Sequence, residues 1–396
     1  MRFPEFEGEW EVKKLGDLLE FKNGINASKE QYGKGVKFIN VLDILNNDFI
    51  TYESIIGKVD VDSTIIEKFS VQYGDVLFQR SSETREEVGT ANIYLDKDKI
   101  ATFGGFVIRG KKIGNYNPIF FNKLLKTESA RESITSKSGG STRFNIGQDI
   151  LSSISLYFPS IYEQDRIASF FSLIDERIQT QNKIIEQLET LIKGLSENLF
   201  SQKIRFKKFE KKWEVKTLGE ILIEINERTI NSNQYRVLSS TAKGLFYQSD
   251  YFNKEVASKD NAGYKILKIN QLVFSPQNLW LGNINVNTTY EIGIVSPSYK
   301  VFSFNEKAIV SYCKYFLKSS KMMFEYEQCS EQGASIVRRN LNMDLFLNIP
   351  ILLPKLEEQI QISSFLTKID QKIQTEKAIL EQLEIQKKYL LQQMFV

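Results

Sequence analysis

The sequence contains no histidine among its 396 residues. This absence removes the commonest general base, the commonest zinc ligand and the usual partner of a serine or cysteine nucleophile. The only cysteines, Cys313 and Cys329, predict neither a disulfide framework nor a thiolate metal cluster, so we expect them to be packing residues. No proline precedes an aspartate, and no GxxxxGK loop is present. The sequence therefore predicts no catalytic residue and no metal site, which favours a binding function.

Long apolar runs are also missing. No stretch approaches the roughly eighteen apolar residues of a membrane span, and the start MRFPEFEGEWEVKK lacks the apolar core of a signal peptide. We therefore expect a cytoplasmic protein. Its net charge is only +3, too small for nucleic-acid binding through bulk charge, so any such site needs clustered basic groups. The densest basic run, residues 201–213, is interpreted as a solvated linker, with phosphate contact as the alternative.

What the sequence does contain is a long helix that occurs twice. In residues 161–200 the apolar side chains alternate four and three residues apart, with one polar interruption at Gln181. The same phase recurs 195 residues later, in residues 356–395, where Glu376 is the interruption. We assign helix pairing to Ile167, Phe171, Ile174, Ile178, Ile185 and Leu188 in the first copy, and to Ile362, Leu366, Ile369, Ile373, Leu380 and Leu383 in the second.

Each apolar stripe needs a partner, and two similar stripes in one chain predict an antiparallel coiled coil. Gln181 and Glu376 either fix the register of this pair or are tolerated at a solvated edge, and both readings remain open. Lys387 occupies the position that Ile192 holds in the first copy. We therefore expect the second helix to pack less regularly near its end.

The repeat extends beyond the helices. The entry EWEVKKLGDLLEF at residues 9–21 recurs as KWEVKTLGEIL at residues 212–222. Between each entry and its helix, strand-like runs alternate with turns and a helical stretch. The predicted class is α+β, with two similar mixed α/β domains, two long paired helices and a pseudo-twofold internal repeat. The predicted boundaries are 1–160 for the first domain, 161–204 for a helix and linker, 205–353 for the second domain and 354–396 for the C-terminal helix.

Two loops in each domain concentrate polar and basic side chains. In the first domain, one loop follows the strand GDVLF and the other is the stretch SKSGGSTRFNI. In the second domain, the corresponding loops lie in QLVFSPQN and GASIVRRNL. If the ligand is DNA, arginine, glutamine and asparagine side chains can read base edges directly. The candidate residues for such DNA contacts are Gln79, Arg80, Ser81, Ser82, Thr142, Arg143 and Asn145, followed by Ser275, Gln277, Asn278, Arg338, Arg339 and Asn340.

The order of these features resembles the specificity subunit of type I restriction-modification systems. The resemblance spans essentially the whole chain and depends on a duplicated series: Trp-x-x-x-x-Leu-Gly, a variable domain, proline, Glu-Gln-x-x-Ile and a long helix. In this sequence the series runs through Trp10, Gly16, Pro159, Glu163 and Ile167, then through Trp213, Gly219, Pro354, Glu358 and Ile362.

The resemblance implies that each domain is a target recognition domain reading one half of a split DNA site. It also implies two modification subunits that bring S-adenosylmethionine and the methyltransferase site, and restriction subunits that use ATP and Mg²⁺. This chain itself would then bind no cofactor. About forty helical residues span roughly 60 Å, or about seventeen base pairs of axial rise, which makes the helices a plausible ruler between half-sites.

Two other classes of function stay open at this point. One is a coiled-coil scaffold whose two globular domains bind proteins, which suits the small net charge. The other is a methyltransferase acting alone, for which residues 117–120 (NPIF) and 296–299 (SPSY) are incomplete versions of an amine-holding motif that lack the second proline.

Overall fold

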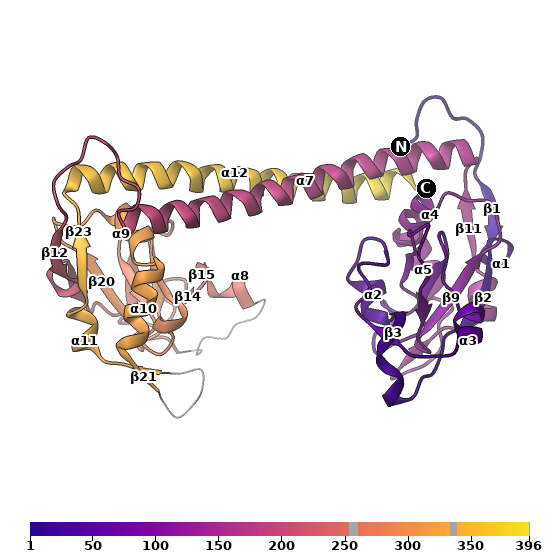
Figure 1. Ribbon diagram of the computed structural model, residues 1–396, viewed down its shortest axis with the longest axis horizontal. Helices are drawn as coiled ribbons and strands as arrows, with labels where there is room; N and C mark the ends of the chain where they lie inside the picture. The colour runs from indigo at the N-terminus through magenta and orange to yellow at the C-terminus, as the bar shows by residue number, and fades with distance from the viewer. Residues whose placement is uncertain (253–259, 333–338, 396) are drawn as a thin grey trace. The chain divides into compact units, whose positions relative to one another are not determined.

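The computed structural model describes residues 1–252, 260–332 and 339–395. The chain forms two compact units. Unit 1 comprises Met1–Asn182 with Ile379–Val396, and unit 2 comprises Lys183–Ala378. Each unit contains one globular domain together with the start of one long helix and the end of the other; these helices are α7 (Ile161–Phe200) and α12 (Leu356–Met394) (Figure 1). No helix in the described part of the chain is long and apolar enough to cross a membrane.

The domain of unit 1 is built on an antiparallel sheet of order β2-β9-β5-β7. A ladder of β1 with β11 joins the entry segment to the strand that precedes α7. The elements are β1 (Glu11–Lys14), α1 (Leu15–Leu18), β2 (Leu19–Asn23), η1 (Lys29–Gln31), β3 (Tyr32–Ile39), α2 (Val41–Leu45), β4 (Lys58–Val59), α3 (Ser63–Lys68), β5 (Val76–Gln79), β6 (Ser81–Ser82), β7 (Ala91–Ile93), β8 (Thr102–Phe103), β9 (Val107–Lys112), α4 (Pro118–Leu125), α5 (Glu128–Thr135), β10 (Phe144–Asn145), α6 (Gln148–Ser152) and β11 (Ser155–Phe158).

The domain of unit 2 has a matching antiparallel sheet of order β13-β20-β17-β18, and the ladder of β12 with β23 corresponds to β1 with β11. Its elements are β12 (Glu214–Thr217), η2 (Leu218–Glu220), β13 (Leu222–Ile225), β14 (Leu238–Thr241), β15 (Gly244–Tyr247), α8 (Gln248–Phe252), β16 (Lys265–Lys268), β17 (Leu272–Phe274), η3 (Leu279–Leu281), β18 (Ile284–Val286), β19 (Ile292–Val295), β20 (Lys300–Phe304), α9 (Val310–Phe316), α10 (Ser320–Gln328), β21 (Ser330–Gln332), β22 (Arg339–Leu341), α11 (Met343–Leu347) and β23 (Pro350–Leu353).

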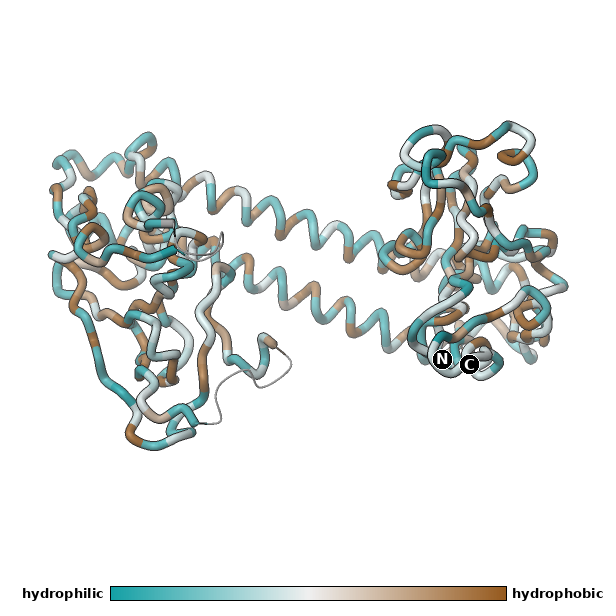
Figure 2. Tube along the Cα trace, turned by 90° about the horizontal axis from the view of Figure 1, so that it is seen from below, coloured by the Kyte–Doolittle hydropathy of each residue, from teal (hydrophilic) through white to brown (hydrophobic). Residues whose placement is uncertain are grey.

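The predicted internal repeat is thus confirmed in the strand order of both domains. In each domain the strand that carries the first candidate loop, β5 or β17, lies inside the sheet between two antiparallel neighbours. Its residues are buried, as expected for an apolar run flanked by turns. The tube coloured by hydropathy shows apolar and polar stretches alternating along the chain in both units (Figure 2). The sheet therefore places the end of a buried strand at a fixed point from which a polar loop departs.

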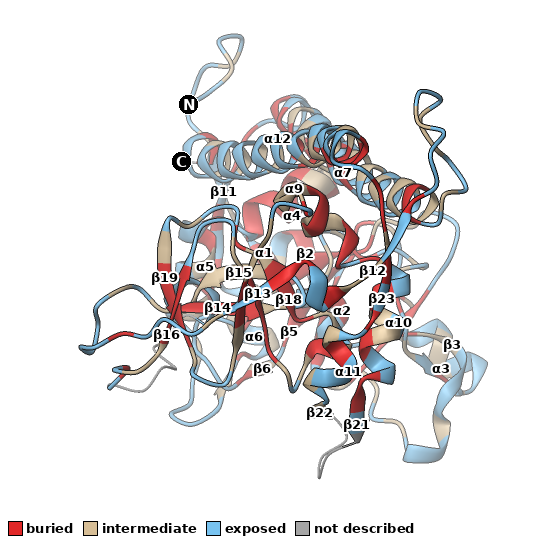
Figure 3. Ribbon diagram, turned by 90° about the vertical axis from the view of Figure 1, so that its left-hand side faces the viewer, coloured by how far each residue is buried: buried red, intermediate tan, exposed pale blue. Residues whose placement is uncertain are grey.

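The long helices belong to the same cores as the domains. In unit 1, Ile167 and Phe171 of α7 join a buried cluster with Met394 and Phe395 at the end of the chain. In unit 2, Ile362 and Leu366 of α12 join a cluster with Leu199 and Phe200. The start of each helix therefore packs beside the end of the other, which is the predicted antiparallel arrangement. A buried helix of each domain, α4 or α9, lies beneath them (Figure 3).

Every residue assigned to helix pairing is buried or half-buried in the structure. The two polar interruptions, Gln181 and Glu376, are also buried, at 5% and 7% exposure, which does not fit a solvated edge. Glu376 forms an ion pair with Lys372 on its own helix. The expected irregularity at Lys387 is not seen, because α12 continues to Met394 and the Lys387 ammonium lies 2.7 Å from the Asp175 carboxylate of α7.

The buried Glu-Gln pair at the start of each long helix ties three segments together. Glu163 accepts hydrogen bonds from Arg2 at 2.6 and 2.7 Å, and Glu358 accepts the equivalent bonds from Arg205 at 2.7 and 2.8 Å. The neighbouring glutamine donates to the carbonyl of the preceding proline and accepts from the backbone N–H that begins α4 or α9. The repeated polar motif is therefore a structural joint, and part of the basic run at 201–213 serves it.

Candidate nucleic-acid interface

In unit 1 the two candidate loops, far apart in sequence, meet at the end of β5. The short strand β6 pairs antiparallel with β10, so that Ser81 lies opposite Asn145. The Ser81 hydroxyl donates to the Asn145 side-chain oxygen at 2.6 Å. The N–H of Ile146 donates to the Arg80 carbonyl at 3.0 Å, which fastens the second loop to the first. The structure thus brings the two predicted loops into one surface.

The candidate residues of unit 1 divide into buried and exposed groups. Gln79 and Ser82 are buried; Gln79 donates to the Ser81 carbonyl at 3.0 Å, and Ser82 donates to the Glu87 carboxylate at 2.8 Å. These bonds hold the turn. The exposed candidates, which can meet a ligand directly, are Arg80, Thr142, Arg143 and Asn145, with Ser81 half-buried between them.

A cleft beside Arg80 contains residues that the sequence pattern did not single out. Its volume is about 250 Å³, and aromatic and amide side chains line it, among them Asn26, Phe38 and Phe106. The Arg80 N–H donates to the Phe106 carbonyl at 2.9 Å, so the aromatic residue stands next to the predicted base reader. The Phe106 side chain is 62% exposed.

The glycines at 104 and 105 permit this close packing. A Cβ added to Gly105 would lie 1.9 Å from the Asn26 side-chain oxygen, and a Cβ on Gly24 would lie 2.1 Å from the Gly104 carbonyl oxygen. An adjacent glycine pair followed by an exposed aromatic residue, between two strands, was the available sequence signal for this cleft.

In unit 2 the corresponding loops also approach each other. Arg339 begins β22, and its N–H donates to the Gln277 carbonyl at 3.2 Å. β22 pairs with β21, which places Asn340 opposite Glu331. Gln277 and Asn340 are exposed, and Arg339 is half-buried. Of the remaining candidates, Ser275 is buried, Asn278 is half-buried, and Arg338 lies outside the described residues.

The Arg339 side chain is held in a defined position. Its guanidinium lies 4.1 Å from the centre of the Trp280 ring and 3.2 Å from the Glu327 carboxylate. Stacking and a charged partner reduce the rotamer entropy that an arginine loses when it binds. Trp280 was not among the residues predicted from sequence, because its role depends on a stacking contact with a residue nearly sixty positions away.

The described residues contain no group of three or more His, Cys, Asp or Glu side chains that could hold a metal ion. Among the candidate residues that the structure describes, the exposed side chains are those of Arg80, Thr142, Arg143, Asn145, Gln277 and Asn340. All of them can donate hydrogen bonds, and the two arginines carry positive charge, which suits contact with phosphates and base edges. The chemistry of both surfaces is therefore that of recognition.

Two domains of one design, each with polar loops that meet at a strand end and each packed on paired long helices, make a recognition subunit with two readers. The family model described as "Type I restriction modification DNA specificity domain" matches residues 7–190 and again residues 210–385. The chain belongs to this family and is a type I specificity subunit, a recognition component and not an enzyme by itself.

Individual relatives agree with this assignment. The type I restriction enzyme MjaVIII specificity subunit of Methanocaldococcus jannaschii is 25% identical, over 99% of this chain and 92% of that protein. The S subunit of the type I restriction-modification system of M. genitalium matches with a TM-score of 0.54 at 16% identity, over 100% of this chain and 99% of that one. A chain solved in work on complex assembly of the type I R-M system matches with a TM-score of 0.59 at 15% identity, over 98% and 97%. At these identities the structural matches show the fold alone.

Proposed function

We propose that the domain of unit 1 reads one half of a split DNA site and the domain of unit 2 reads the other half. The supporting observation is that both domains use the same sheet to bring two polar loops together at the end of its inner strand, while the loops themselves differ in residues and contacts. A common frame with different loops suits two readers of different sequences. We keep 1–160 and 205–353 as the boundaries of these target recognition domains.

Within each surface we assign base reading to the exposed or stacked side chains. Arg80, Arg143 and Arg339 can each take guanine O6 and N7 together, and Gln277 or Asn340 can take adenine N6 and N7. The buried candidates Gln79 and Ser82 then have a different role: they shape the loop by the hydrogen bonds described above. Thr142, Asn145 and Asn278 complete the surfaces as donors to phosphates or bases.

The long helices are proposed as the docking surface for modification subunits. Besides the buried seam, α7 exposes Leu173 in unit 1 and Leu191 in unit 2, and α12 exposes Ile385 and Tyr389 one turn apart. Apolar side chains outside a seam already buried suit contact with further helices. Because both units carry such residues, two copies of a modification subunit fit the repeat.

We assign the remaining chemistry to partner proteins. S-adenosylmethionine is proposed on the modification subunits, and ATP with Mg²⁺ on restriction subunits that join the same assembly. Since the target is DNA, we place the assembly in the cytoplasm. This chain then supplies specificity, and the partners supply methyl transfer and cleavage.

Methylation mapping tests the proposal. DNA from cells that express this chain with its modification subunit should contain a split modified motif with a fixed gap, absent from cells that lack this chain. Arg80→Ala should relax one base in one half of the motif, and Arg339→Ala should relax one base in the other half, each at about 1–3 kcal/mol. If the complex assembles and no new motif arises, the proposal fails and a protein-binding scaffold replaces it.

A further inference from the structure

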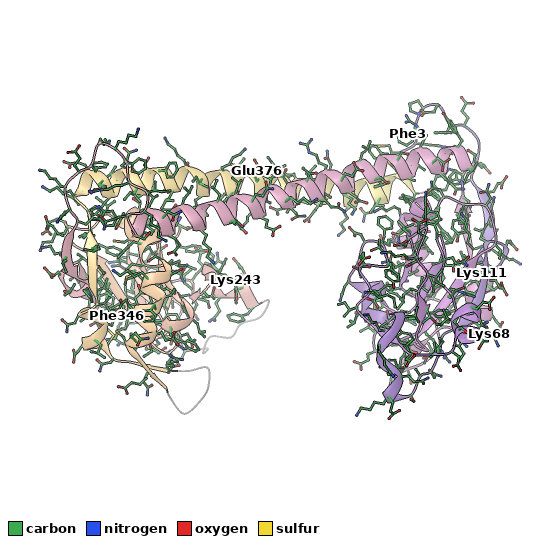
Figure 4. The ribbon with its side chains drawn as sticks, viewed as in Figure 1. Phe3, Lys68, Lys111, Lys243, Phe346 and Glu376 are labelled. Carbon is green, nitrogen blue, oxygen red and sulfur yellow. The ribbon has the colours of Figure 1, made fainter. Side chains whose placement is uncertain are left out.

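A large cavity lies within unit 2, away from the loops that we assign to base reading. Its volume is about 880 Å³, and it is bounded by α7, α9, α12, the end of β18 and the hairpin of β14 and β15. Four lysines line it: Lys193 on α7, Lys243 in the hairpin turn, and Lys314 and Lys318 on or just after α9. Figure 4 shows Lys243 on the hairpin, below α7.

The two acidic side chains in the cavity wall already have partners. Asp370 accepts a hydrogen bond from the Lys314 ammonium at 2.7 Å. Glu197 accepts from both the backbone N–H and the hydroxyl of Ser320, each at 2.8 Å. Within the described part of the chain, Lys193, Lys243 and Lys318 form no ion pair; the Lys318 ammonium donates only to the Asn285 side-chain oxygen, at 2.7 Å. Positive charge in the cavity is therefore left uncompensated.

The internal repeat supplies a comparison. Lys126 in unit 1 and Lys318 in unit 2 occupy equivalent positions in the repeat. Each lies the same number of residues after the backbone N–H that donates to the glutamine of a long helix, which is that of Asn117 in unit 1 and that of Ile309 in unit 2. In unit 1 a loop carbonyl binds the lysine: Lys126 donates to the Asp48 carbonyl at 2.7 Å. The ring of Phe49 lies 5.8 Å from the same ammonium. In unit 2 the equivalent place is the open cavity.

We propose that this cavity binds the phosphate of a phosphate-bearing ligand. Lysine ammonium groups are compact point charges that suit phosphate oxygens. The hydroxyl of Thr288, which is exposed, offers a further hydrogen-bond donor in the wall, and Phe246 offers an aromatic face. The volume lies within the range of ligand cavities, roughly 300–1,000 Å³.

Electrostatics favours an anion at Lys318. Although its side chain is exposed along the cavity, the surrounding protein lowers the pKa of Lys318, and the positive charge of Lys314 lowers it further. An anion bound beside this ammonium stabilises its charged form. Binding of the anion should therefore weaken as the pH rises and the lysine loses its proton.

The phosphate has two possible sources, a free nucleotide and the DNA backbone. Their shared chemistry is what the cavity recognises, and the proposal does not rest on which bases the domains read. The test uses the full chain, purified with its modification subunit. Calorimetry measures the binding of pyrophosphate and of ADP, and a fluorescence titration measures the binding of a duplex that lacks the methylated motif.

The variant for this test is Lys193→Gln with Lys318→Gln, which removes two charges and keeps polar side chains. Lys368→Gln is the matched control, because Lys368 is an exposed lysine of α12 that does not line the cavity. We expect the double variant to lose about tenfold or more in affinity for a phosphate ligand, as loss of charge-assisted hydrogen bonds requires. The control should stay within about twofold of the parent protein. Thermal unfolding checks that both variants fold.

The pattern of loss identifies the source. If the double variant loses affinity for pyrophosphate or ADP, the ligand is a free phosphate compound. If it loses affinity for the duplex and that affinity depends less steeply on salt, the ligand is a phosphate of the DNA backbone. If the parent protein does not bind the duplex, that result counts against the DNA-reading function. The pyrophosphate titration still tests the cavity in that case. If the free ligands do not bind the parent at millimolar concentration and the double variant binds duplex as the control does, the proposal is overturned.

Discussion

Replacing Asp175 by asparagine should destabilise unit 1 far more than the matched replacement destabilises unit 2. The Asp175 carboxylate lies 2.6 Å from the Lys123 ammonium of α4 and 2.7 Å from that of Lys387 on α12. The Lys123 side chain is only 2% exposed and that of Asp175 is 9% exposed. Removing the carboxylate leaves a buried ammonium without a charged partner, which costs about 3–5 kcal/mol of unfolding free energy.

The pKa values of this cluster agree with that reasoning. Burial raises the pKa of Asp175, but hydrogen bonds and attraction from the two lysines more than offset this, so the net pKa is lowered. Burial lowers the pKa of Lys123 and outweighs the raising effect of Asp175, and the positive charge of Lys387 lowers it further. A lowered aspartate pKa contributes stability above its unfolded value of about 3.9 and loses it as the pH falls through the folded pKa. The cost of Asp175→Asn should therefore shrink in acid.

Two variants serve as controls. Asp370→Asn removes the equivalent carboxylate of unit 2, where Lys314 and Asp370 are 35% and 28% exposed, so we expect a cost of about 1 kcal/mol. Lys387→Ile copies the residue at the repeat position Ile192 and leaves the Lys123 pair intact, so its effect should lie within about 1 kcal/mol in either direction.

Hydrogen exchange is the suitable assay, since the two units need not unfold together. Peptides from α4 report on unit 1 and peptides from α9 report on unit 2, in the same sample. An Asp370→Asn cost equal to or above that of Asp175→Asn would refute the claim that burial sets the energy of these pairs.

Further predictions concern the glycine contact, the exposed aromatic residue and the helix length. Gly24→Ala should cost at least about 1–3 kcal/mol of unfolding free energy, because its Cβ would meet the Gly104 carbonyl, whereas Gly139→Ala has nothing within 4 Å and should stay within about 0.5 kcal/mol in urea titrations. Phe106→Ala should leave unfolding unchanged but weaken binding of the cognate duplex by about 1–3 kcal/mol, and equal affinity would exclude base contact by this ring. Four residues inserted into both α7 and α12 should lengthen each by roughly 6 Å and widen the gap in the methylated motif by about two base pairs; an unchanged gap would exclude the helices as a ruler.

The fold could be predicted from the sequence because the repeat shows which polar residues matter. Glu163 recurs as Glu358, and the structure shows why: each accepts two hydrogen bonds from an arginine in the segment that leads into its domain, Arg2 or Arg205. A buried, fully bonded carboxylate tolerates little change. Repetition of polar positions is therefore stronger evidence of a repeated fold than repetition of apolar ones.

Lys387 was harder to interpret, since a single helix does not reveal what lies across from it. At a seam position a lysine predicts poor packing. In the structure the antiparallel partner supplies Asp175 at that level, so the lysine is half-buried and paired. The register of two helices decides such cases, and sequence periodicity gives only the phase of each.

The two loops of the candidate site could be predicted from the sequence, but the contacts that join them to neighbouring segments could not. Gly105 packs against Asn26, and Arg339 stacks on Trp280, so each contact joins segments that are remote in sequence. Residue type and turn signals located Arg80 and Arg143. They could not show that Gln79 and Ser82 are buried, because burial depends on the strands that flank them: Gln79 pairs with β9, and Ser82 pairs with β10.

The repeated and the unrepeated contacts fall in different parts of each unit. Contacts present twice include the entry ladders, the Glu-Gln joints and the aspartate of each long helix bonded to a lysine of α4 or α9, all of them where a domain meets α7 or α12. Contacts present once include the stacked Arg339, the cleft beside Arg80 and the cavity that holds Lys318. Under the function proposed above, two equivalent platforms for identical partners require the first set to stay alike. Reading two different half-sites would require the second set to differ, and the distribution of contacts in this chain fits both requirements.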